Sequence, residues 1–122
     1  MTSHDTSNKP TIMIIGGGTG MAYLSTDTLT IIIALRTKAE LVLFAKHGID
    51  GVYSADPSLD PTAKLLKKTT FQKIIDEKLL FIDLPAATLA LNQGIVAKVF
   101  RFKDKNSLEK VIQGKSKHTL IN

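Results

Sequence analysis

The segment IIGGGTGMAYLSTDT, residues 14–28, leads from an apolar run through four glycines to hydroxyl groups and a carboxylate. Its apolar start, Thr11–Ile15, is short and β-favouring, which predicts a buried parallel strand that ends at the glycines. Ser25 or Thr26 is a suitable N-cap for a helix over residues 27–38, with Asp27 in its first turn. The segment therefore predicts the first strand, loop and helix of an α/β fold.

The rest of the chain continues this alternation. We expect strands at residues 40–44, 95–100 and 118–121, and helices at residues 70–78, 84–92 and 107–113. The helix over residues 84–92 is expected to carry Leu84, Thr88 and Leu91 on one face and to end at a left-handed Gly94, and the helix over residues 107–113 to be capped by Asn106. Residues 64–69 are expected to pair with residues 52–53. The pattern predicts a three-layer α-β-α fold with a mostly parallel sheet.

Size and composition indicate one domain. The chain has 122 residues, of which 43% are hydrophobic, enough for a packed core. Residues 1–10 are polar and are expected to form a disordered tail, which leaves residues 11–122 as the domain. No Cys is present and the three His are scattered, which excludes a disulfide framework and disfavours a zinc cluster, so we expect a cytoplasmic protein.

The charge of the chain favours anionic partners. Its formal net charge is +5, with many Lys and Arg in residues 64–78 and 98–117. Nucleic acid is not the expected partner, because the two Tyr and five Phe do not interleave with the basic residues as a stacking platform requires. A membrane is not expected either, since no apolar run approaches the roughly 20 residues of a membrane span.

The first glycine loop has two readings on its residues alone. Glycines allow backbone N–H groups to approach an anion, and the hydroxyls of Thr19, Ser25 and Thr26 lie at a helix N-terminus, which favours phosphate. However, the loop matches neither the P-loop nor the dinucleotide-binding glycine pattern. A phosphate cradle and a structural tight turn both remain open.

Two later segments are equally ambiguous. The stretch AKHGIDGVYSADP, residues 45–57, combines an aromatic edge with carboxylates that can accept hydrogen bonds from a ribose or amino group, but Asp-Gly and Asp-Pro also form turns. Asp83, in FIDLPAATLA (residues 81–90), is either a functional carboxylate or a helix N-cap.

Taken together and in this order, these motifs resemble the nucleotide-binding half of the bacterial uridylate (UMP) kinases, in the amino-acid kinase superfamily. The resemblance extends from about residue 12 to GKSKHTLI, residues 114–121. It implies the acetylglutamate kinase-like three-layer fold, truncated at the N-terminus. It also implies transfer of the γ-phosphoryl group from ATP to UMP in pyrimidine biosynthesis, with Mg²⁺ as cofactor and no metal site assigned to residues of this chain.

The resemblance also implies roles for individual residues. Asp27 and Asp83 match carboxylates of the active centre, and His47, Tyr53 and Asp56 match ATP-binding positions. The loop that holds UMP and its phosphate comprises Gly18, Thr19, Gly20, Met21, Ala22, Tyr23, Leu24, Ser25 and Thr26. Met21 to Leu24 depart from the family's usual Asn-Pro-aromatic-aromatic, which bears on UMP selectivity.

The family has a further N-terminal half, with a lysine-bearing strand and a second glycine loop, that this sequence does not match. We therefore expect a truncated or split kinase with negligible turnover by itself. The alternative is a non-catalytic nucleotide-binding or subunit-interaction module. Expected partners are UMP and ATP, together with either copies of the chain, since the family forms hexamers, or a separate N-terminal half.

Overall fold

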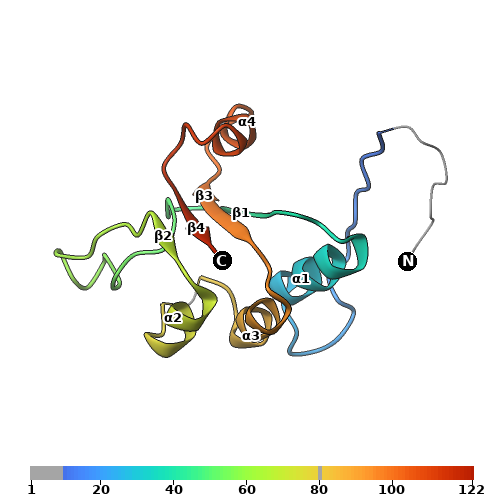
Figure 1. Ribbon diagram of the computed structural model, residues 1–122, viewed down its shortest axis with the longest axis horizontal. Helices are drawn as coiled ribbons and strands as arrows, with labels where there is room; N and C mark the ends of the chain where they lie inside the picture. The colour runs from blue at the N-terminus through green and yellow to red at the C-terminus, as the bar shows by residue number, and fades with distance from the viewer. Residues whose placement is uncertain (1–9, 80) are drawn as a thin grey trace.

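A computed structural model describes residues 10–79 and 81–122, so the predicted tail over residues 1–10 lies almost wholly outside the described residues. Helices and strands alternate along most of the chain (Figure 1). The helices are α1 (Thr26–Thr37), α2 (Phe71–Asp76), α3 (Leu84–Gln93) and α4 (Ser107–Ile112). The strands are β1 (Val42–Lys46), β2 (Lys68–Thr69), β3 (Ala97–Arg101) and β4 (His118–Ile121).

The four strands form one sheet in the order β1-β3-β4-β2. The pairs β1/β3 and β2/β4 are parallel, and β4 runs antiparallel to β3. The expected mostly parallel sheet is therefore confirmed, with one antiparallel junction at its centre. Because β1 and β3 run in the same direction, the loops that follow them open on the same side of the sheet, at the carboxyl ends of these strands.

Helices cover both faces of the sheet. Figure 1 shows α1, α2 and α3 on one side of the strands and α4 on the other. The main core joins Ile31 of α1 and Phe71 and Ile74 of α2 to strand residues such as Phe44 and Val99, all of them buried. Phe100 and Val111 are buried outside this cluster, as expected from the alternation of side chains along β3. This arrangement is the predicted three-layer fold.

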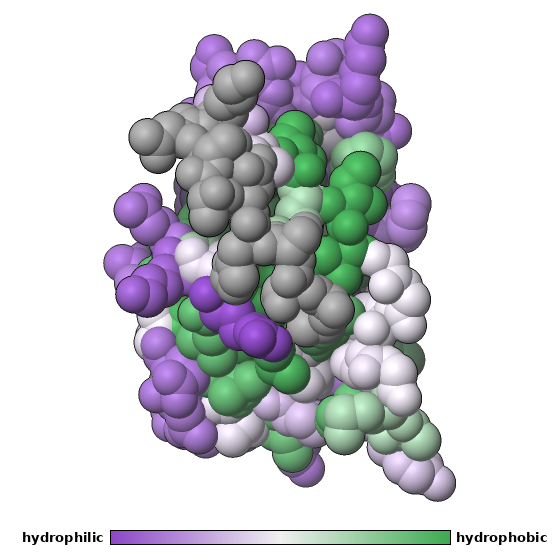
Figure 2. Space-filling view, turned by 90° about the vertical axis from the view of Figure 1, so that its right-hand side faces the viewer, coloured by the Kyte–Doolittle hydropathy of each residue, from purple (hydrophilic) through white to green (hydrophobic). Residues whose placement is uncertain are grey.

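The predicted strand over Thr11–Ile15 is wrong. These residues form no strand, and Ile12 and Ile14 are 91% and 92% exposed. An isolated extended segment needs a neighbouring strand to satisfy its backbone and cover its side chains, and none of the described strands pairs with it. Figure 2, which views the molecule from the right-hand side of Figure 1, shows hydrophobic surface between hydrophilic regions.

The face that α3 buries is not the one that carries Leu84, Thr88 and Leu91. Leu84 and Thr88 are exposed and Leu91 is half-buried, whereas Ala86, Ala87 and Ala90 are fully buried. Helix α3 packs against both α1 and α2, and the small alanine side chains allow a close approach to both. The end of the helix is as predicted, since Gly94 is left-handed with φ 66°.

The start of α4 does not use the predicted cap. Asn106 makes no side-chain capping hydrogen bond, because its backbone is already helical, whereas an N-cap residue has extended dihedrals. The hydroxyl of the next residue, Ser107, instead accepts the backbone N–H groups of Lys103 and Asp104. Ser107 thereby orders the turn between β3 and α4.

One buried hydroxyl ties the long loop after β1 to the sheet. The Oγ1 of Thr119 in β4 accepts the N–H of Val52 at 2.9 Å and donates to the carbonyl of Leu66. Leu66 N–H in turn donates to Val52, and Tyr53 forms a bridge with Leu65, so the expected pairing of these segments is confirmed. The close approach leaves no room for a side chain at residue 51, where a Cβ would lie 2.5 Å from Thr119 Oγ1.

We predict that Gly51→Ala lowers the free energy of unfolding by about 1–3 kcal/mol, because the added methyl group must displace Thr119. Gly16→Ala is the matched control, since no atom lies within 4 Å of its added Cβ. Urea denaturation of the two variants measures both values. Equal stability of the two variants would contradict the packing argument.

Candidate active site

The N-terminus of α1 is built by Ser25. Its backbone is extended, and its Oγ accepts the N–H groups of Asp27 and Thr28 at 3.2 and 3.4 Å. This is the N-cap geometry that the sequence predicted. It places Asp27 in the first turn of the helix, where the helix dipole stabilises a negative charge.

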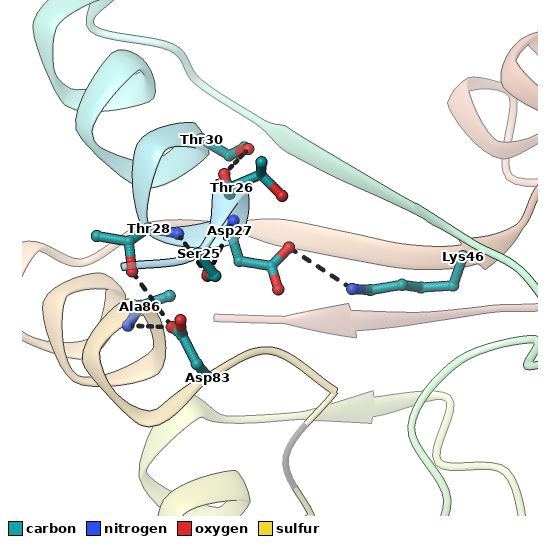
Figure 3. A network of polar contacts seen from close by, with 8 residues as sticks. All are labelled: Ser25, Thr26, Asp27, Thr28, Thr30, Lys46, Asp83 and Ala86. Carbon is teal, nitrogen blue, oxygen red and sulfur yellow. Dashed lines mark hydrogen bonds and ion pairs between the residues drawn. The ribbon is translucent and has the colours of Figure 1, made fainter. Parts of the chain in front are cut away.

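Asp27 forms an ion pair with Lys46, the last residue of β1 (Figure 3). Lys46 Nζ lies 3.6 Å from Asp27 Oδ1, and both side chains are only 24% exposed, so salt screens this pair less than a surface pair. The ammonium also lies 5.9 Å from the centre of the Phe81 ring. From the sequence, no role was predicted for Lys46, although it lies at the carboxyl end of a parallel strand, where ligand-binding residues are expected.

Asp83 joins the N-termini of two helices. Its Oδ1 accepts the N–H of Ala86 at 3.0 Å, which caps α3, and the hydroxyl of Thr28 in α1 at 3.2 Å (Figure 3). Asp83 is therefore a helix N-cap, which is the structural role that its sequence position allowed. Burial raises the pKa of Asp83, but hydrogen bonds from Ser25, Ala86 and Thr28 outweigh it, so the pKa lies below its ordinary value.

The first glycine loop forms a compact turn. Thr19 Oγ1 accepts the N–H of Met21 and lies 3.2 Å from the carbonyl of Leu24, so this hydroxyl points into its own loop. Gly18 and Gly20 have left-handed backbones, and so does Tyr23, whose side chain is fully exposed. The loop is therefore shaped by its own contacts.

A cavity of about 430 Å³ lies beside this loop. Gly16, Gly17 and Gly18 line it together with Thr26, Leu29 and Thr30 at the start of α1. Of the nine residues predicted to hold UMP, the described lining of this cavity includes two, Gly18 and Thr26.

A second cavity, of about 250 Å³, lies beside the loop after β1. Tyr53 and Asp56 line it, and so do Lys78, Leu79 and Phe81. His47 is exposed and is not among the lining residues, so the structure brings together two of the three predicted ATP-binding residues. Hydrogen bonds from the hydroxyl and N–H of Ser58 lower the pKa of Asp56 and keep it ionised.

Asp27 and Lys46 each lie next to a residue that lines one of these two cavities. Thr26, next to Asp27, borders the first, and Phe81, beneath Lys46, borders the second. A cation close to two cavities can neutralise phosphate charge, and carboxylates beside it can bind a metal–nucleotide complex. Within residues 10–79 and 81–122 there is no group of three His, Cys, Asp or Glu that could hold a metal ion by itself.

Comparison with known sequences places the chain among kinases. A model described as the amino acid kinase family matches residues 4–118. The uridylate kinases of Mesoplasma florum and Mycoplasma capricolum are 42% and 41% identical over 114 residues, which are 93% of this chain and 48% of either relative. The chain thus spans about half the length of the curated relatives it matches.

Solved structures share the fold. The UMP kinase from Ureaplasma parvum superposes with a TM-score of 0.79 at 32% sequence identity, over 86% of this chain and 45% of that protein. The UMP kinase from Bacillus anthracis gives the same TM-score at 30% identity, over 88% and 44% of the two chains.

No helix among the described residues is long and apolar enough to cross a membrane.

We predict a pH-dependent stability that traces to Asp83. The pKa of Asp83 is lower in the folded protein than in the unfolded chain. Its charge therefore adds to the free energy of unfolding above the unfolded pKa of about 4, and this contribution is lost as the pH falls through the pKa of the folded state. Asp83→Asn keeps a capping oxygen but no charge, so its deficit in unfolding free energy should shrink between about pH 7 and about pH 3.

Urea titrations at several pH values measure this deficit. Glu40→Gln is the control, because Glu40 is exposed and has no hydrogen bond or ion pair within the described chain. Its curve should run parallel to that of the unmodified protein. A deficit for Asp83→Asn that stays constant over the whole range would show that the charge contributes nothing.

Proposed function

The chain belongs to the amino acid kinase family, and from this we propose that it supplies the nucleotide-binding half of a UMP kinase. The reaction is transfer of the γ-phosphoryl group of ATP to UMP, which gives ADP and UDP. The proposal draws support from relatives named uridylate kinase and from the UMP kinase structures that share the fold.

The observation that carries the proposal is the group Asp27, Lys46 and Asp83, whose neighbours Thr26 and Phe81 line the two cavities. Phosphoryl transfer requires two nucleotides held end to end, with positive charge where their phosphates meet. The two cavities offer separate places for the nucleotides, and Lys46 is a cation next to Phe81, which lines one of them. No covalent intermediate on the protein is needed.

We assign the cavity beside Tyr53 and Asp56 to ATP. The Tyr53 and Phe81 rings provide apolar walls for a base, and the ionised Asp56 can accept hydrogen bonds from hydroxyl or amino groups. His47 is exposed at the rim of the same loop and has to turn inward to contact ATP.

We assign the cavity beside the glycine loop to UMP. The backbone N–H groups of residues 16–20 and the N-terminus of α1 provide donors for its phosphate. Met21 and Tyr23 are exposed around the loop and are free to close on the uracil or ribose.

The residues present are suited to bind Mg²⁺ only when the ion is also bound to the phosphates of ATP. Mg²⁺ commonly binds through one or two carboxylates and the substrate phosphates, and Asp27 and Asp83 are two carboxylates at the start of α1 and of α3. When bound, the ion neutralises the phosphates that pass between donor and acceptor. Asp83 and Asp27 would hold the ion, and Lys46 would balance their charge.

A second candidate function is a subunit-interaction module, favoured by the apolar segment Ile12–Ile15. Ile12 and Ile14 are almost fully exposed, and β1 is an edge strand of the sheet. Unpaired edges and exposed apolar residues invite association with another chain. Further copies of this chain, or a separate half of the enzyme, would cover this side.

The two tyrosines of the chain give a crossed test of the ligand assignment. We predict that Tyr53→Ala weakens ATP binding about tenfold and leaves UMP binding unchanged, since its ring lines the ATP cavity. Tyr23→Ala should affect only UMP. Calorimetric titration with each nucleotide measures both effects. Loss of ATP affinity in both variants, or in neither, would refute the two-cavity assignment.

We further predict negligible turnover by these 122 residues alone, because each missing electrostatic contact costs about 10²–10³ in rate. A coupled assay for ADP with ATP, UMP and Mg²⁺ measures it, alone and after addition of the remaining half of the Mesoplasma florum uridylate kinase. Restored turnover that Lys46→Met abolishes supports a split kinase. Nucleotide binding without turnover in the mixture supports the interaction module.

A further inference from the structure

A third cavity, of about 270 Å³, has no role in the proposed reaction. It lies where β3 ends and is bounded by α4 and by the residues that lead into β4. Five cationic side chains line it: Arg101, Lys103, Lys110, Lys115 and Lys117. Only two carboxylates, Asp50 and Asp104, lie among them. The lining therefore has a strong excess of positive charge.

None of these five cations is neutralised by an ion pair. Within residues 10–79 and 81–122, the ion pair within 4.0 Å is that of Asp27 with Lys46, which is the register partner of Arg101 in the neighbouring strand. Like charges held around one cavity repel each other, and this repulsion is relieved when an anion enters. A surface that only needed to be hydrated would not require them to converge on a hollow.

Two serine hydroxyls line the same cavity. Ser116 Oγ is shielded from solvent and has no hydrogen-bond partner in the described part of the chain. Ser107 is 7% exposed, and its Oγ accepts two backbone N–H groups while its own proton has no acceptor among the described residues. Buried hydroxyls without partners cost free energy, so two unused donors in a cationic cavity suit an oxyanion.

We propose that this cavity binds a small anion that carries two or more phosphate groups, either free or as the phosphate chain of a nucleotide. The excess of cations matches a multiply charged ligand, and Lys110 and Lys117 face it from α4 and from the approach to β4. The volume is below that of most drug-sized ligand sites, and the described lining includes no aromatic ring on which a nucleic-acid base would stack.

Titration of the full chain with inorganic tripolyphosphate tests the site. We expect one bound ligand, and an affinity about tenfold weaker in Lys110→Gln/Lys117→Gln, because two charge-assisted contacts are lost. The control Lys68→Gln/Lys73→Gln removes the same charge from exposed positions on β2 and α2 and should bind normally. Equal losses in the two double variants would overturn the proposal.

Two single variants keep the test valid if the double variant fails to fold. Ser116→Ala should weaken binding several-fold, and Asp104→Asn should strengthen it, because it removes a negative charge and keeps the oxygen that accepts the N–H of Asn106. General surface electrostatics would also strengthen binding in Asp104→Asn but would leave Ser116→Ala unchanged, so the loss in Ser116→Ala is the diagnostic result. No change in either variant would overturn the assignment.

Competition identifies the class of ligand and separates this site from the proposed kinase site. Tripolyphosphate binding that survives saturation with ATP and UMP, and survives Tyr53→Ala, supports a separate site even if the proposed kinase activity is refuted. Displacement by ATP that Tyr53→Ala relieves would assign the anion to the ATP cavity and overturn the proposal. Tighter binding of a single-stranded RNA, lost in Lys110→Gln/Lys117→Gln, would replace the small anion with nucleic acid.

Discussion

The carboxylate of Asp83 is the contact on which the arrangement of the candidate site depends. It caps α3 through Ala86 and accepts the hydroxyl of Thr28 in α1, so one negative charge holds two helix N-termini together. The buried alanine face of α3 allows this approach. With α1 placed in this way, Asp27 reaches Lys46 at the end of β1, and Thr26 and Phe81 beside this ion pair line the two cavities.

Charge is distributed unevenly over the molecule. Around the proposed kinase site, carboxylates and a lysine nearly balance, which suits a reaction whose ligands bring their own negative charge and a metal ion. At the end of β3, five cations meet two carboxylates around a separate hollow. Both regions lie at the edge of the sheet where parallel strands end, but they present different electrostatic environments to a ligand.

Local signals predicted much of the fold, and long-range packing explains the errors. Ser25 and Gly94 act at helix ends through neighbouring backbone, so their roles could be read from adjacent residues. Thr11–Ile15 has the composition of a buried strand but lacks a partner strand within the described chain. The exposure of Leu84 and the role of Lys46 both depend on residues far away in the sequence, which periodicity does not reveal.

The sequence by itself determined the order of helices and strands after residue 25, most helix ends, the glycine turns and the likeness to the amino acid kinases, because these depend on short runs of residues. Tertiary structure decided which side chains meet. The pairing of Asp27 with Lys46, the bridge from Asp83 to Thr28 and the cationic cavity around Ser116 each join segments distant in the chain. Only the folded sheet and its packed helices bring such segments within a few ångströms of each other.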